Sequence, residues 1–157
     1  MSLAVEQLEL ESCANLSGAL EAILNRFSAL SGTIHILDAD NLLHLAASRD
    51  IPEAVLERIR TIPVGKGMAG LAVERRQPVS VCNIQTDLSG DVQPGAKATG
   101  LQGAIALPIF RGEAVIGALG IAVPHEHTFS EGEINELAAI GRILANKFIG
   151  NLRSTAA

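Results

Sequence analysis

A hydroxyl and an imidazole lie two residues apart in an otherwise apolar segment, at Thr33 and His35 of Thr33-Ile34-His35-Ile36-Leu37. Side chains two apart in a β-strand point to the same face, so we expect both polar groups on one face of a strand. Such groups are either satisfied within the protein or available to a ligand. A lone histidine on a strand is more often simply hydrogen-bonded than it is a ligand of haem or of a metal. We therefore favour a hydrogen bond within the protein or to a small-molecule ligand.

A second candidate for binding chemistry is the segment Val64-Gly65-Lys66-Gly67-Met68-Ala69-Gly70, which predicts a turn and a short helix beginning near Met68. Backbone amides at the start of a helix favour acceptor or anionic groups, and Gly67 and Gly70 would let the backbone approach closely. The segment is not a nucleotide-binding fingerprint. It lacks the third glycine at the required spacing, and no βαβ unit encloses it.

Thiol and metal chemistry have few candidate residues in this chain. The two cysteines, Cys13 and Cys82, are far apart, and we expect free thiols rather than a disulfide. We expect Cys82 to be a small buried apolar residue on a strand. His125 and His127 flank Glu126, and in an extended segment this spacing would allow both histidines to bind one metal ion. No third ligand is evident, which favours a solvated loop.

The composition bounds the class of protein. A chain of 157 residues with 48% hydrophobic residues is long enough for one domain with a proper core. The net charge of −5, the scattered basic residues and the absence of Tyr and Trp argue against nucleic acid as a partner. No apolar run approaches the ~18 residues that would span a bilayer, and the start lacks a secretory signal. We therefore expect a cytoplasmic protein with no membrane partner.

Helical periodicity appears at both ends of the chain. Apolar residues recur at threes and fours over about residues 4–30, and Ser31-Gly32 is expected to stop that helix. A second long helix is predicted over about 130–152, because Ser130 and Glu133 form a capping-box pattern. Pro52 opens a short helix that continues to about Ile59.

Strands are predicted at residues 33–37, 42–48, 80–82, 104–109 and 114–121. Because most arrive as hairpins, we predict an α+β fold with a central antiparallel sheet of five to six strands. The long terminal helices should cover one face, and the short helices with a lid loop the other. The rest of the long helices' apolar stripes could pair with a second copy, so we expect a homodimer, although both stripes could instead be core.

Several short motifs follow one another along the chain. They are Gly67-Met68-Ala69-Gly70, Gln77-Pro78-Val79, Asn83-Ile84-Gln85-Thr86-Asp87, Leu107-Pro108-Ile109 and Val115-Ile116-Gly117-Ala118-Leu119-Gly120. Their order resembles the GAF domain, a small-molecule-sensing module of signalling proteins. No motif is specific alone, but their order and spacing together cover nearly all of the chain. The resemblance implies a single domain over 1–157, with terminal helices at about 4–30 and 130–152 and the sheet and pocket at about 33–123.

The resemblance also implies where a ligand would lie. The first strand would contribute Thr33 and His35, and the helix start would contribute Met68 and Ala69. Asp87 and the following loop, around Asp91 and Thr99, would form the far wall. The loop from Leu88 to Gly100 would act as a lid, because a connection of this length is usually functional or mobile.

The function implied is that of a sensory domain that binds a small metabolite and signals through a helix-mediated dimer to a partner or output domain. No cofactor is expected. One alternative is a ligand-free dimerisation module whose pocket is filled by Met68, Ile105 and Leu107. A further alternative is a thiol-based reductase of free methionine sulfoxide, although the long loop lacks the cysteines on which those enzymes rely. The bilin-binding and cyclic-nucleotide-binding branches are not matched by the residues around Cys82 or Asn146.

Overall fold

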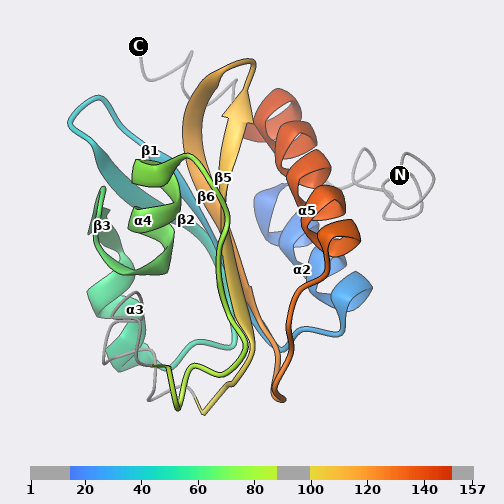
Figure 1. The fold of residues 1–157 in the computed structure, drawn as a ribbon. Coiled ribbons are helices and arrows are strands. Elements are labelled where there is room, and N and C mark those ends of the chain that lie inside the picture. The colour runs from blue at the N-terminus through green and yellow to red at the C-terminus, as the bar shows by residue number, and fades with distance from the viewer. Residues whose placement is uncertain (1–14, 88–99, 150–157) are drawn as a thin grey trace.

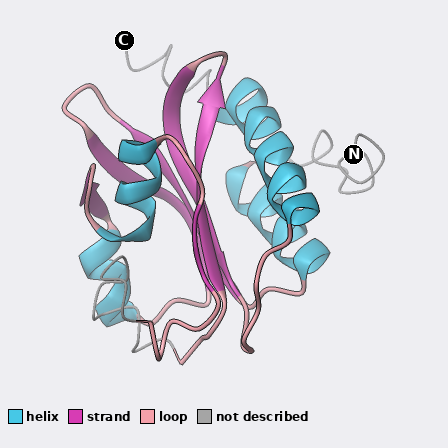
Figure 2. Cartoon of the chain, in the orientation of Figure 1, coloured by secondary structure: helices cyan, strands magenta, loops and turns pink. Residues whose placement is uncertain are grey.

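The computed structural model describes residues 15–87 and 100–149, which form a six-stranded antiparallel sheet with helices on both faces (Figures 1 and 2). The strands are β1 (Ser31–Leu37), β2 (Leu42–Arg49), β3 (Thr61–Pro63), β4 (Val79–Val81), β5 (Ala104–Arg111) and β6 (Ala114–Ala122). They lie in the order β3-β2-β1-β6-β5-β4. The predicted α+β class with a central antiparallel sheet is confirmed.

The helices divide between the two faces of the sheet as predicted. Within the described residues the α-helices are α2 (Leu16–Phe27), α3 (Glu53–Ile59), α4 (Gly67–Arg75) and α5 (Glu131–Leu144), and α5 continues into a π-helical segment, Ala145–Ile149. The terminal helices α2 and α5 lie side by side on one face, and α3 and α4 lie on the other (Figure 1). The predicted lid loop, Gly100 apart, lies outside the described residues.

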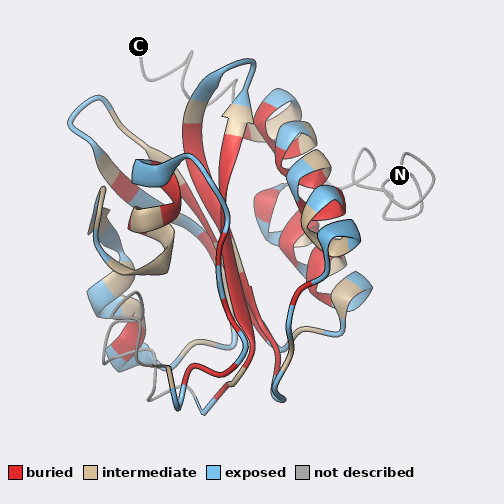
Figure 3. Ribbon diagram, viewed as in Figure 1, coloured by how far each residue is buried: buried red, intermediate tan, exposed pale blue. Residues whose placement is uncertain are grey.

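The main core lies between the sheet and the pair α2 and α5 (Figure 3). Its largest members are fully buried aliphatic side chains. They include Leu20 and Ile23 of α2, Ile34, Ile105, Ile109 and Leu119 of the strands, and Leu137, Ile140 and Leu144 of α5. Burying a side chain of this kind contributes about 1.5–3 kcal/mol relative to leaving it exposed. This face therefore supplies most of the fold's apolar stabilisation.

Helix α2 begins at Leu16 and ends at Phe27, three residues before the predicted end, and residues 4–14 of the predicted helix lie outside the described residues. Its first turn is capped by the Asn15 side chain, which accepts a hydrogen bond from Gly18 N at 2.9 Å, and it ends at Phe27 with Ser28 in the left-handed region. The glycine expected to stop the helix is instead in β1. A Cβ on Gly32 would lie 2.9 Å from both Leu24 Cδ2 and Gly120 O, so α2 packs too closely on the strand for any side chain there.

The starts of α3 and α5 agree with the prediction. Pro52 precedes α3 as its N-cap residue. Ser130 and Glu133 form the predicted capping box, with Glu133 N donating to Ser130 Oγ at 3.1 Å and Ser130 N donating to Glu133 Oε1 at 2.9 Å. Residues 150–152 of the predicted C-terminal helix lie outside the described residues.

Two strand assignments needed correction. The pattern does not predict β3, a three-residue edge strand that pairs with β2 through Leu43 and Ile62. The predicted strand 80–82 lies one residue too far along, since β4 is Val79–Val81. Cys82 therefore follows the strand instead of ending it. None of the helices in residues 15–87 and 100–149 is long and apolar enough to cross a membrane.

Candidate functional site

The sheet face under α3 and α4 is built from small side chains at its centre. Strands β5 and β6 place Ala104 opposite Ala122 and Ala106 opposite Gly120. Met68 of α4 packs against the cluster that contains Ala104 and Ala122 and against the cluster that contains Ala106, so these positions lie on the α4 side of the sheet. A face of alanine and glycine leaves more room beneath its helices than the isoleucine and leucine of the opposite face.

Two central-strand residues on this face remain half-buried. Thr33 of β1 pairs with Gly120 of β6, and both have intermediate exposure. A Cβ on Gly120 would lie 3.2 Å from Thr33 Oγ1, which places the hydroxyl over the glycine on the same face. Ile34 and Leu119, the adjacent pair on the opposite face, are both 0% exposed. The short helices α3 and α4 therefore leave part of the sheet centre accessible.

His35 lies on the same face as Thr33, two residues along β1, as predicted from the alternation. It is 1% exposed and pairs with Ala118 of β6. Its Nε2 lies 2.7 Å from the carbonyl oxygen of Ile59, at the end of α3, and its Nδ1 is buried with no hydrogen-bond partner. Burial lowers the pKa of His35; the Ile59 carbonyl opposes that shift, and His44 adds to it. His35 is therefore neutral near pH 7.

The predicted helix start contributes Met68 and Ala69, both half-buried. Ala69 packs against the cluster of Leu43, Val73 and Ala118, next to His35, while Met68 reaches the clusters around Ala106 and Ala122. Lys66, the N-cap residue, makes no side-chain hydrogen bond to the first turn of α4. Each glycine of the motif has a reason to be glycine: a Cβ on Gly70 would lie 2.6 Å from Pro63 O, and Gly65 and Gly67 have positive φ values of 92° and 64°.

The far wall of the predicted site is described in part. Asp87 is half-buried, and Asp91 and Thr99 lie outside the described residues. The ends of the loop that contains them are held together, since Ile84 N donates to Gln102 O at 2.6 Å and Gln85 Nε2 donates to Leu101 O at 2.9 Å. The structure therefore brings Thr33, His35, Met68 and Ala69 to one face of the sheet.

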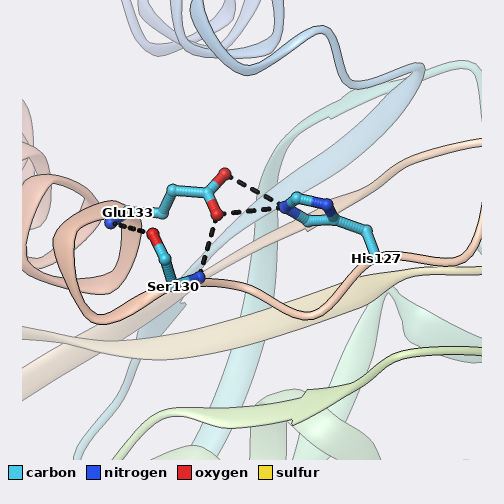
Figure 4. Close-up of polar contacts among 3 residues, drawn as sticks. All are labelled: His127, Ser130 and Glu133. Carbon is cyan, nitrogen blue, oxygen red and sulfur yellow. Dashed lines mark hydrogen bonds and ion pairs between the residues drawn. The ribbon is translucent and has the colours of Figure 1, made fainter.

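The segment before α5 connects the end of β4 to the α5 N-terminus. Asn83 Nδ2 donates to Glu126 Oε1 at 3.0 Å, and His127 N donates to the Cys82 carbonyl oxygen at 3.1 Å. The His127 ring contacts the Glu133 carboxylate at 3.0 and 3.1 Å, and Glu133 belongs to the capping box (Figure 4). These long-range contacts were not predicted, because nothing in the sequence pairs Asn83 with Glu126.

The thiol and metal candidates stand apart from this arrangement. Cys82 is a free thiol, but it is exposed, which corrects the expectation of a buried strand residue. The cause is the earlier end of β4, which leaves Cys82 outside the sheet. Within residues 15–87 and 100–149, no three His, Cys, Asp or Glu residues are close enough together to hold a metal ion. His127 is engaged with Glu133, and Cys13 lies outside the described residues.

The GAF-family sequence model matches residues 14–147 of the chain. No curated protein is significantly similar to it in sequence. Among solved structures, the GAF domain of a phosphoenolpyruvate-protein phosphotransferase from Coxiella burnetii has a TM-score of 0.78 at 21% identity, covering 98% of this chain and 94% of that chain. The corresponding GAF domain from Acinetobacter has a TM-score of 0.75 at 17% identity, covering 98% and 97%.

A catalytic protein has the same architecture. The free methionine-R-sulfoxide reductase from Neisseria meningitidis, solved in complex with its substrate, has a TM-score of 0.70 at 21% identity, covering 92% of this chain and 81% of that chain. At these identities the likeness establishes the fold, and that fold is shared by GAF domains of phosphotransferases and by reductases. The family match and the six-stranded sheet lead to one conclusion: the chain belongs to the GAF domain family.

Proposed function

We propose that this chain is a sensory GAF domain that binds a small metabolite on the face covered by α3 and α4. The observation that carries the proposal is the half-buried pair Thr33 and Gly120 in the two central strands, beside the fully buried pair Ile34 and Leu119. Apolar packing alone would cover both faces of central strands. A face left open beside a buried polar ring suits a ligand site.

Output from such a site would run through α5. The segment after β6 fastens the end of β4 to the α5 N-terminus through Asn83–Glu126 and His127–Glu133. The β5–β6 turn provides a second connection, because Arg76 Nη2 donates to Glu113 O at 2.6 Å and Arg142 Nη1 donates to Gly112 O at 3.2 Å. Arg76 is the C-cap residue of α4, and Arg142 belongs to α5. A shift of α4 would therefore be transmitted through the β5–β6 turn to α5.

The proposal includes a homodimer formed through the terminal helices, which would pass the shift of α5 to a partner or output domain. Within the described residues, the inner stripes of α2 and α5 are used by the core, and Leu30 is the exposed large apolar residue, at 50%. Half-buried Phe27, Ile143 and Phe148 flank that core. A dimer interface would therefore draw on these side chains.

The domain is proposed to be non-enzymatic. The likeness to the reductases favours one competing function, and exposed Cys82 is its one described thiol. Reduction of a sulfoxide by a thiolate requires a second thiol to resolve the oxidised sulfur, and Cys13 lies in the N-terminal segment outside the described residues. Methionine sulfoxide consumption by the wild-type protein, lost on Cys82→Ser, would establish the reductase instead.

The test is a thermal-shift screen of the purified protein against amino acids, 2-oxo acids, cyclic nucleotides and haem. A ligand at a hundred times its dissociation constant adds about 2.7 kcal/mol to the free energy of unfolding. Gly120→Ala places a methyl group 3.2 Å from Thr33 Oγ1 and should abolish the response. Gly132→Ala is the matched control, because its new Cβ would meet Ser130 Oγ at an ordinary 3.9 Å.

A hit retained by Gly132→Ala and lost by Gly120→Ala supports the proposed site. Asp87→Ala then tests whether the site extends to the far wall implied by the family resemblance. A hit that persists in Gly120→Ala contradicts this location. A panel without any hit favours the ligand-free dimerisation module, in which Met68 would fill the space. Ile105 and Leu107, which were expected to fill it with Met68, lie instead in the main core against α2 and α5.

A further inference from the structure

The buried ring of His35 carries information about the ligand itself. The Ile59 carbonyl oxygen can only accept a hydrogen bond, so the Nε2 atom 2.7 Å away must carry the proton. In a neutral imidazole the other nitrogen is then an acceptor. The tautomer is therefore fixed by the end of α3, and Nδ1 presents a lone pair.

That lone pair has no partner in the protein. His35 is 1% exposed, and its Nδ1 is the buried side-chain nitrogen or oxygen atom without a hydrogen bond in the described residues. Leaving a buried acceptor unpaired is unfavourable, so native proteins rarely keep one without a role. Protonation would not relieve the cost, because burial holds the ring in its neutral form.

The surroundings of His35 belong to the proposed ligand site. Thr33 is its neighbour on the same strand face, and Ala118, its β6 partner, packs in the cluster that contacts Ala69 of α4. Half-buried Gly120 lies next along β6 on that face. A small molecule over Thr33 and Gly120 would therefore be within one strand position of the imidazole.

We infer that His35 accepts a hydrogen bond from the ligand, so that the metabolite belongs to the class of small molecules with a hydroxyl, amine or amide N–H donor at the buried end of the site. The inference rests on the proposed function and adds the polarity of one ligand atom. A carboxylate or carbonyl oxygen at that position would face the Nδ1 lone pair and be rejected. The binding residue is His35, and Thr33 beside it can both donate and accept.

Pairs of probes that differ only in this donor test the inference. Amino acids and 2-hydroxy acids are compared with the 2-oxo acids of the same carbon skeleton, by calorimetry and thermal shift, on the wild-type protein. Loss of the donor leaves Nδ1 unpaired, and we expect the oxo member of a binding pair to bind at least about tenfold more weakly. Equal affinities within every binding pair would overturn the inference.

Two substitutions distinguish the roles of the two ring nitrogens of His35. His35→Gln places an amide near Nε2 and can keep the contact with Ile59, whereas His35→Asn places an amide near Nδ1. The preference for the donor-bearing probe should disappear in His35→Gln and persist at least in part in His35→Asn. If His35→Gln keeps the full preference for the donor-bearing probe, a group other than His35 accepts that hydrogen bond.

Nitrogen NMR of the wild-type protein gives a readout that needs no variant to fold. In the free protein, the His35 Nδ1 signal should be that of an unprotonated nitrogen, and it should shift when a stabilising probe is added. A protonated Nδ1, or one unmoved by a probe that stabilises the protein, overturns this inference while the sensor proposal survives. If no probe stabilises the protein at millimolar concentration, both proposals fail together.

Discussion

The two faces of the six-stranded sheet are built from the same strands but are packed differently. The face under α2 and α5 carries large aliphatic side chains with almost no exposure, such as Ile34 and Leu119. The face under α3 and α4 carries alanine and glycine at its centre, with Thr33 half-buried and His35 incompletely hydrogen-bonded. The difference fits the proposed division of labour, in which one face stabilises the fold and the other would give up packing for a binding site.

The largest difference between the faces should appear in apolar truncations within β6. Leu119→Ala removes a fully buried side chain from the main core and should lower the free energy of unfolding by about 2–5 kcal/mol. Val115→Ala, in the same strand but half-buried on the other face, should cost about 1 kcal/mol or less. Urea denaturation measures both, and equal losses would mean that the faces are packed alike.

The ion pair between the terminal helices should matter more than one at the surface. Arg26 Nη2 lies 2.9 Å from Glu136 Oε1, whose side chain is only 9% exposed, so Arg26→Ala leaves a nearly buried carboxylate without its cation. We expect a loss of about 1–3 kcal/mol. The control is Arg49→Ala, which breaks an exposed pair with Glu21 and should cost under about 1 kcal/mol. If both variants lose a similarly small free energy of unfolding, the Arg26–Glu136 ion pair does not contribute to the pairing of α2 and α5.

The capping box of α5 gives a prediction that depends on pH. Ser130→Ala should destabilise the protein by about 1 kcal/mol, because the α5 N-terminus loses its side-chain acceptor. Burial tends to raise the pKa of Glu133, but the hydrogen bond from the Ser130 amide and the contact with His127 lower it below its usual 4.5. The stabilisation is therefore complete above the unfolded pKa and is lost as pH falls through the folded one.

Urea titrations at a series of pH values below about 5 check this sign. Glu133→Gln should flatten the part of the acid slope that Glu133 contributes. A slope unchanged by Glu133→Gln would mean that other carboxylates set it.

The smallest expected effect is at Cys82. Because the side chain is exposed and has no disulfide, Cys82→Ser should change the free energy of unfolding by less than about 0.5 kcal/mol. It should also leave ligand-induced stabilisation unchanged. If this variant no longer binds the ligand, Cys82 belongs to the ligand site, and the reductase becomes the stronger candidate function.

The regular elements could be predicted because their local patterns are strong. Hairpin alternation placed Thr33 and His35 on one strand face, and the Ser130–Glu133 pattern located the α5 start. The edge strand β3 was missed, because three residues are too few to show alternation. Cys82 was placed wrongly, since a one-residue shift in a strand end changes its environment from sheet to solvent.

The details of the candidate site depend on contacts between distant segments. The bond from His35 to Ile59 spans 24 residues, and the exposure of Thr33 depends on how far α4 extends over β6. Periodicity can assign a residue to a face, but it cannot say whether a helix covers that residue. Similarly, the sequence shows the histidine but not the unpaired nitrogen.

The central claim is that the sheet centre is accessible on one face only, and cysteine labelling measures this directly. Thr33→Cys and Ile34→Cys are made in a chain that carries Cys13→Ser and Cys82→Ser, and the rate of reaction with a small thiol reagent is followed under native conditions. We predict that the thiol of Thr33→Cys reacts much faster than that of Ile34→Cys. The second thiol can react only when the core opens transiently. If both thiols react at the same slow rate, the face under α3 and α4 is closed and the proposed site is contradicted.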